Sequence, residues 1–160
     1  MKKFTGAVSA ILSVLILLAA TGCGNAKTPK DVDISAMAAA IIKSGAYTDS
    51  MSDKSTAAQT LYGIDAADVK QSDVYFSSMA TAEECAVFEA VDSAAAGRIL
   101  TACQTRQTSQ VSSYENYVPT EVAKINAAVV AQSGNYVLYI VSNDQAAVKT
   151  VLAQYGFDIK

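Results

Sequence analysis

Hydrophobic residues recur three and four positions apart after Asp33, which is the spacing of one face of an α-helix. Asp33 can cap this helix, and Gly45 stands where helices commonly end. A second, shorter helix is predicted over residues 54–62, with Gly63 after it. The apolar positions of the first helix are Ile34, Met37, Ala38, Ile41 and Ile42.

The spacing then changes to a pattern typical of β-strands. Residues 73–79 and 84–91 are predicted to form a hairpin, because a polar turn of small residues separates two runs that contain β-branched and aromatic side chains. Asp92 can cap the helix that follows, whose apolar residues again have helical spacing and which can continue to Tyr114.

The same order recurs near the C-terminus. Residues 126–131 and 136–142 flank a turn signal at 133–135, and Asp144 can cap a final helix that Gly156 ends. The repeated order of strand, strand and helix predicts an α+β fold. We expect a four-stranded, mostly antiparallel sheet with helices on one face, preceded by two N-terminal helices that cover an edge or the same face.

The N-terminus carries a different signal. Lys2 and Lys3 precede an apolar stretch at residues 7–20, which is the layout of a secretory signal peptide. The sequence Ala20-Thr21-Gly22-Cys23 resembles the lipobox of bacterial lipoproteins. That resemblance implies that cleavage makes Cys23 the mature N-terminus and that its thiol carries a diacylglycerol. The predicted parts are a signal peptide (1–22), a lipidated tether (23–30) and one α+β domain (31–160).

Two alternatives for the N-terminus remain open: an uncleaved membrane-spanning helix over residues 4–26, and a secreted protein that is cleaved elsewhere. Under each interpretation the positive-inside rule keeps Lys2 and Lys3 in the cytoplasm, so the rest of the chain is predicted to be extracytoplasmic. Two acyl chains are enough for stable anchoring. The predicted location is therefore the extracytoplasmic side of the cell membrane, through a lipid anchor.

The amino-acid composition excludes several kinds of catalysis and binding. The 160 residues include no histidine, which excludes Ser-His-Asp and Cys-His catalysis and His-ligated zinc. The chain has two arginines and a formal net charge of −3, so we do not expect it to bind nucleic acid. No segment has the spacing of a phosphate-binding or calcium-binding loop, and we predict neither a cofactor nor a metal site.

Carboxylates and thiols are the remaining candidate groups. Glu84 and Glu89 should point to opposite faces of their strand because their separation is odd, and both they and Glu83 are expected to be edge or surface charges. Cys85 and Cys103 can either pair in a disulfide or be two buried small apolar side chains. A catalytic thiol is not expected, since no histidine or cluster of cations would lower its pKa.

Most of the tyrosines occupy core-like positions, but Tyr114 and Tyr117 are predicted to form an exposed contact surface. With the lipobox leader, several short segments resemble domain-of-unknown-function family 4358, an uncharacterised lipoprotein family of Gram-positive bacteria. The resemblance implies a small extracytoplasmic lipoprotein of unknown role, with no catalytic residues to carry over. The segments are Leu61-Tyr62-Gly63-Ile64, Glu84-Cys85-Ala86-Val87-Phe88, the pair Tyr114 and Tyr117, and Gly134-Asn135-Tyr136-Val137.

Two classes of function fit these observations. The first is a non-enzymatic lipoprotein that binds an envelope protein, a peptide or a wall component. The second is a small envelope hydrolase or redox protein that uses carboxylates or the Cys85 and Cys103 pair. An exposed apolar sheet face would favour binding, whereas a deep cleft converging on Glu84, Glu89 or Cys85 would favour an enzyme.

Overall fold

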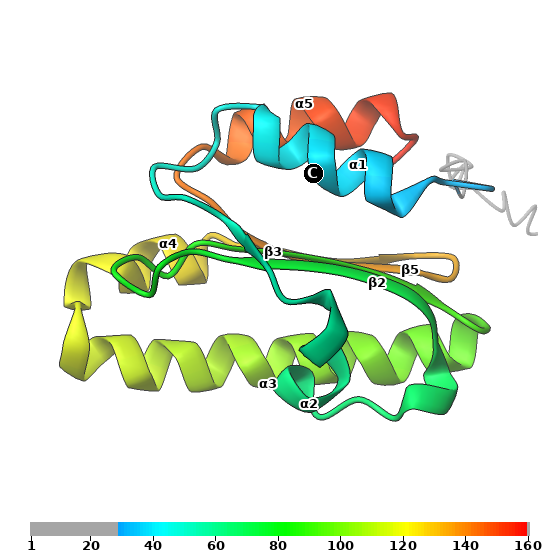
Figure 1. Ribbon diagram of the computed structural model, residues 1–160, viewed down its shortest axis with the longest axis horizontal. Coiled ribbons are helices and arrows are strands. Elements are labelled where there is room, and N and C mark those ends of the chain that lie inside the picture. Colours follow the sequence, from blue (N-terminus) through cyan, green and yellow to red (C-terminus); the bar gives the residue numbers. More distant parts are fainter. Residues whose placement is uncertain (1–28, 160) are drawn as a thin grey trace, which may run out of the picture.

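The computed structural model describes residues 29–159, which fold into one sheet with helices on either side (Figure 1). Three short 3₁₀ turns connect the main elements, at Ser55–Ala57, Ala66–Asp68 and Pro119–Glu121. In chain order the main elements are α1 (Ile34–Lys43), β1 (Ser52–Asp53), α2 (Ala58–Tyr62), β2 (Val69–Phe76), β3 (Glu84–Ala90), α3 (Ser93–Tyr117), α4 (Val122–Asn126), β4 (Val129–Ser133), β5 (Tyr136–Val141) and α5 (Gln145–Gln154).

The sheet within residues 29–159 has five antiparallel strands in the order β1-β2-β3-β5-β4. Both expected hairpins are present, β2 with β3 and β4 with β5. The expectation of four strands is wrong, because β1 adds a fifth strand at the edge beside β2. The two residues of β1 are both exposed, so no alternation of apolar and polar residues marks it in the sequence.

Helices cover both faces of the sheet, which corrects the expectation of helices on one face. In Figure 1, α1 and α5 lie on one side of the sheet and α2 and α3 lie on the other. α4 lies at the end of the sheet and contributes Ile125 to the same core as α2 and α3. The two N-terminal helices are therefore divided between the faces. The physical reason lies in β3 and β5, whose residues are buried almost throughout. Strands buried on both faces need a layer of structure on each side.

Alternation along β3 divides the hydrophobic core into two clusters. Ala86 and Phe88 pack toward α2, α3 and α4, where they meet Ile99 and Cys103 of α3. The intervening Val87 packs toward α1 and α5. The structure is therefore a three-layer arrangement in which the central sheet separates two cores.

The predicted N-terminal caps of α1, α3 and α5 are confirmed, whereas α2 has no side-chain cap and begins at Ala58 rather than at residue 54. Asp33 accepts a hydrogen bond from the Ala36 N–H, and Asp92 and Asp144 cap α3 and α5 in the same way. Gly63 ends α2 in the left-handed region, at φ +64°. The first strand of the second hairpin begins at Val129 rather than at residue 126, because residues up to Asn126 form α4.

Among residues 29–159, no helix has both the length and the apolar composition needed to cross a bilayer. The predicted signal peptide, the alternative membrane helix over residues 4–26 and Cys23 all lie outside the described residues.

Candidate functional site

A cavity of about 470 Å³ lies between α2, α3 and the turn at residues 77–83 that joins β2 to β3. We call it the α2–α3 cleft. Most of its wall is apolar, and its charged groups come from the β2–β3 turn, β3, α3 and the segment before α2. The lining includes the apolar residues Ala57, Leu61, Phe76, Met79, Ala82 and Tyr114 and the charged residues Lys54, Glu83, Glu84 and Arg106.

Exposed apolar side chains gather at the rim of this cleft. Met79 is 72% exposed and has a positive φ of 72°, which is uncommon for a residue other than glycine. Leu61 is also exposed and lines the cleft. Tyr117 is 70% exposed and makes an edge-to-face contact with Tyr114, which is itself part of the lining. Of the large apolar side chains exposed in the described residues, Val91 is the one with no place in this group.

The floor of the cleft is an ion pair between Arg106 of α3 and Glu84 of β3. The guanidinium donates two hydrogen bonds, from Nε to Oε1 at 2.6 Å and from Nη2 to Oε2 at 2.8 Å. It also lies over the rings of Tyr62 and Phe76, with the central guanidinium carbon 5.0 and 4.7 Å from their centroids. These contacts hold the plane of the guanidinium in one orientation.

Glu84 is not the surface charge that the sequence suggested, since its side chain is 2% exposed. Besides the two bonds from Arg106, its carboxylate accepts hydrogen bonds from the Tyr62 hydroxyl and from Gln110 Nε2. Gln110 in turn accepts a hydrogen bond from the hydroxyl of Tyr139. Four donors occupy the two carboxylate oxygens, which leaves no acceptor position for a proton from a substrate.

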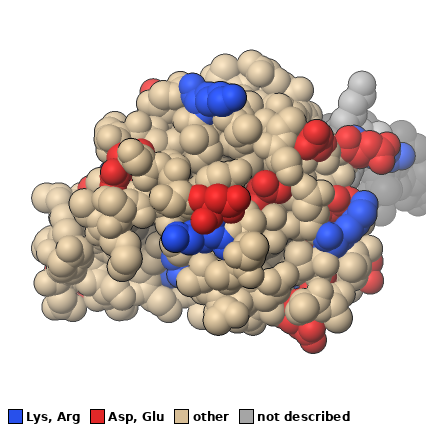
Figure 2. All heavy atoms as spheres, viewed as in Figure 1, with Lys and Arg blue, Asp and Glu red and all other residues tan. Residues whose placement is uncertain are grey.

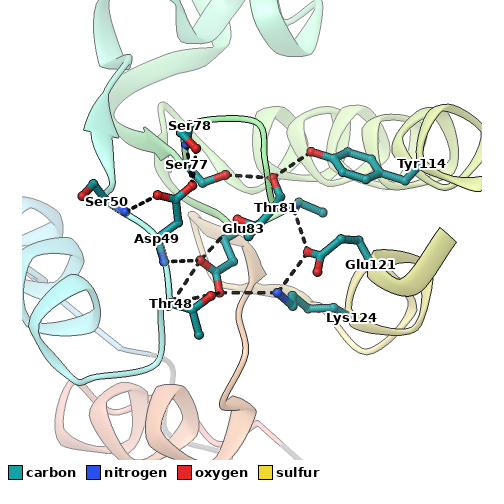
Figure 3. Close-up of polar contacts among 11 residues, drawn as sticks. Thr48, Asp49, Ser50, Ser77, Ser78, Thr81, Glu83, Tyr114, Glu121 and Lys124 are labelled. Atoms are coloured by element: carbon teal, nitrogen blue, oxygen red, sulfur yellow. Dashed lines mark hydrogen bonds and ion pairs between the residues drawn. The ribbon is translucent and has the colours of Figure 1, made fainter. Parts of the chain in front are cut away.

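Glu83 also lines the cleft and is also buried, again contrary to expectation (Figure 3). Its carboxylate accepts hydrogen bonds from the N–H groups of Thr48 and Asp49 at 3.0 Å and from the Thr48 hydroxyl at 2.8 Å. Lys124 of α4 bridges Glu83 and Glu121, at 3.4 and 2.9 Å. Burial alone would raise the pKa of Glu83, but these hydrogen bonds and the Lys124 charge outweigh it and lower the pKa.

Hydrogen bonds hold the β2–β3 turn from two sides, as Figure 3 shows. Asp49 accepts hydrogen bonds from the N–H and hydroxyl of Ser78. The carbonyl of Thr81 accepts hydrogen bonds from Ser77 Oγ and from the Tyr114 hydroxyl, each at 2.8 Å. The turn is therefore fixed between the loop after α1 and the C-terminal part of α3, and it presents Met79 at the rim of the cleft.

The two cysteines do not come together. Cys85 belongs to the core beneath α1 and α5, whereas Cys103 belongs to the core on the other side of the sheet. Both are buried free thiols, which fits the interpretation as small apolar side chains and not the disulfide. Burial raises the pKa of Cys85 to about 12 and also raises the pKa of Cys103, so neither forms a thiolate readily.

The structure confirms that Glu84 and Glu89 face opposite sides of the sheet. Glu89 lies away from the cleft and pairs with Lys70 at 2.6 Å. The cleft therefore reaches Glu84 but includes neither Glu89 nor Cys85. Tyr114 is half-buried in the cleft wall, and Tyr117 is exposed, so this predicted pair belongs to the rim of the site.

Two site residues that the sequence reasoning missed have a signal in the helix spacing. Arg106 and Gln110 follow Ile99 and Cys103 at intervals of three and four, on the face of α3 that packs against the sheet. Long polar side chains at core-facing positions need buried partners, and here that partner is Glu84.

Candidate metal ligands do not cluster in the described part of the chain: no group of three or more acidic or cysteine side chains there could hold an ion. On the face drawn in Figure 2, basic and acidic side chains are interspersed, and no extended basic area is visible.

The fold and the site define a three-layer α+β domain with an apolar cleft above a buried ion pair. The model of the family described as domain of unknown function DUF4358 matches residues 43–142, which is more than half of the chain. The chain belongs to this family. The matched region contains the whole sheet, α2, α3, α4 and every residue of the cleft lining. No curated protein and no solved structure matches the chain significantly.

Proposed function

We propose that this protein is a lipid-anchored extracytoplasmic binding module that holds its ligand in the α2–α3 cleft. The observation that carries the proposal is the combination of an exposed apolar rim with a cavity of about 470 Å³. Ligand pockets are commonly apolar cavities of about 300–1,000 Å³ with a small number of polar groups. Both faces of the sheet are covered and the cleft reaches Glu84, which is the arrangement expected above for an enzyme rather than for a binding module. Binding is favoured here because four hydrogen-bond donors already occupy the Glu84 carboxylate.

The state of the charged groups supports binding rather than catalysis. The carboxylates of Glu83 and Glu84 are buried and accept hydrogen bonds at both oxygens. General acid or base catalysis needs a group that can reach the substrate and exchange a proton with it. Cys85 and Cys103 lie in separate cores with raised pKa values, so a redox pair has no support.

The position of the tether supports a cleft that faces away from the membrane. Pro29 lies beside Asn135 and Tyr136 in the hollow at the turn between β4 and β5. This turn adjoins the Glu89 end of β3, because Glu89 pairs with Tyr136, whereas the cleft is lined by Glu84 at the other end. Figure 1 shows the β2–β3 turn and the β4–β5 turn at opposite ends of the sheet. Five residues of strand separate the two ends by about 17 Å. A short lipidated tether would therefore leave the cleft on the side remote from the bilayer.

Metabolic labelling tests the anchor. Cells grown with an alkyne analogue of palmitate should incorporate label into the full chain, and the label should be lost in Cys23→Ala. Cys85→Ala is the matched control, because its buried thiol should not affect acylation. The anchor is refuted if Cys23→Ala keeps the label and stays in the membrane fraction.

Binding of the neutral apolar dye Nile red tests the cleft. The full chain in lipid nanodiscs should show saturable dye fluorescence above that of empty nanodiscs, and Met79→Ser should weaken it. Val91→Ser is the matched control, because Val91 is also exposed but lies outside the cleft. Equal binding by the parent and the two variants would contradict the proposed site.

A further inference from the structure

We infer that the ligand of the α2–α3 cleft is a small amphipathic carboxylate, whose apolar part lies against Leu61, Phe76 and Met79 and whose head group meets Arg106 and Lys54. This inference rests on the proposed binding function and names the class of ligand.

The first reason is that the negative charges lining the cleft are buried, whereas its positive charges are accessible to a ligand. Glu83 and Glu84 line it, but their carboxylates are buried and fully hydrogen-bonded. Arg106 keeps 20% of its side chain exposed, and Lys54 at the mouth is exposed. Asp53 beside Lys54 accepts hydrogen bonds from Ser55 and is not part of the lining. A ligand therefore meets cationic groups first.

The second reason is the number of hydrogen-bond donors left on Arg106. A guanidinium has five N–H donors. Within residues 29–159 two of them bond to Glu84, which leaves three, including both on Nη1. Because the rings of Tyr62 and Phe76 hold the guanidinium plane, these donors are already oriented before a ligand arrives. A carboxylate is an anion of matching planar shape.

The third reason is that the alternatives each leave part of the cleft unmatched. A purely apolar ligand would cover the Arg106 donors without bonding them, and burying unpaired donors is unfavourable. A cation would meet Arg106 and Lys54 with the same charge. A polyanion without apolar groups would leave Leu61 and Met79 in water. Arg106 already pairs with Glu84, so Lys54 is the one cation of the lining without an ion pair within residues 29–159, and this favours a single negative charge over a doubly charged phosphate.

A set of probes with the same apolar group and different heads tests the inference. The full chain in lipid nanodiscs is titrated with 4-phenylbutyrate, 4-phenylbutan-1-ol and 4-phenylbutylamine, and binding is followed by saturation-transfer NMR against empty nanodiscs. The carboxylate should bind at least about tenfold more tightly than the alcohol, and the amine should bind most weakly. The preference for the carboxylate should shrink as salt is added.

Two lysine variants separate the charge at the cleft from the charge of the whole protein. Lys54→Gln should weaken 4-phenylbutyrate binding several-fold and leave the alcohol unchanged. Lys43→Gln removes the same charge from the end of α1, outside the cleft, and should change neither affinity. Arg106→Lys keeps the charge but loses the fork of donors, and in samples that keep the parent circular dichroism spectrum it should remove most of the preference.

Equal affinity for the carboxylate and the alcohol would overturn the inference, and so would the absence of carboxylate binding or tighter binding of 4-phenylbutyl phosphate. Under each of these results, saturable Nile red binding that Met79→Ser weakens would leave the proposed function standing. If Nile red also fails to bind, the proposed function fails as well.

Discussion

Replacement of Glu83 by alanine should destabilise the fold far more than removal of an ordinary surface glutamate. The variant leaves the N–H groups of Thr48 and Asp49 and one side of the Lys124 ammonium without their acceptor. Each buried donor left unpaired costs about 1–3 kcal/mol. Thr48 is exposed and Lys124 keeps Glu121, so water and the second carboxylate offset part of this loss. We therefore expect a loss of about 3 kcal/mol, from a total that is typically about 5–15 kcal/mol.

Equilibrium urea unfolding, followed by far-UV circular dichroism, measures this loss. Glu89→Ala is the matched control, because Glu89 lies on β3, the strand that follows Glu83, but pairs with Lys70, whose side chain is mostly exposed. Such a pair contributes at most about 1 kcal/mol. Amide hydrogen exchange at Thr48 and Asp49 should become faster in Glu83→Ala and stay unchanged in Glu89→Ala. If the two variants differ by less than about 0.5 kcal/mol, Glu83 does not hold the turn in the way described.

Three further outcomes are expected. Folding lowers the pKa of Glu83, so its contribution to stability is complete above its ordinary pKa of 4.5 and is lost as the pH falls through the lowered value. In Glu83→Gln, the free energy of unfolding should therefore depend less on pH on the acid side than in the parent. Cys85 and Cys103 should resist thiol reagents in the native protein and react after unfolding, and a mass measurement that shows them joined would contradict their placement in separate cores. Gly63→Ala should cost about 1 kcal/mol in urea unfolding, because a side chain at φ +64° is strained; an unchanged midpoint would contradict this.

Local signals in the sequence were enough to predict α1, α3 and α5. Asp33, Asp92 and Asp144 each precede a run of apolar residues with helical spacing, and each caps the helix that follows. The number of strands and the layering depend on longer-range packing. β1 has two exposed residues and exists because β2 pairs with it. The apolar run at Tyr136–Val141 has no polar alternation, which is the signal that β5 is covered on both faces.

The site was harder to predict because its partners are distant in the sequence. Glu83 and Glu84 were expected at the surface on charge alone. The residues that stabilise them as buried carboxylates, Lys124 and Arg106, lie 41 and 22 positions further along the chain. Only the fold brings these side chains together. The spacing of Arg106 and Gln110 on the core-facing side of α3 is the one clue in the sequence, since it places two long polar side chains where an apolar residue is expected.

The division of the hydrophobic core by the sheet has a practical consequence for engineering. Residues that pack beneath α1 and α5 share no cluster with those that pack beneath α3, although both sets include alternate residues of β3. Substitutions in the α1 and α5 layer can therefore raise thermal tolerance without reshaping the cavity. Substitutions around the cavity can likewise change ligand selectivity, and the stability of the opposite layer can offset the folding free energy that such changes cost.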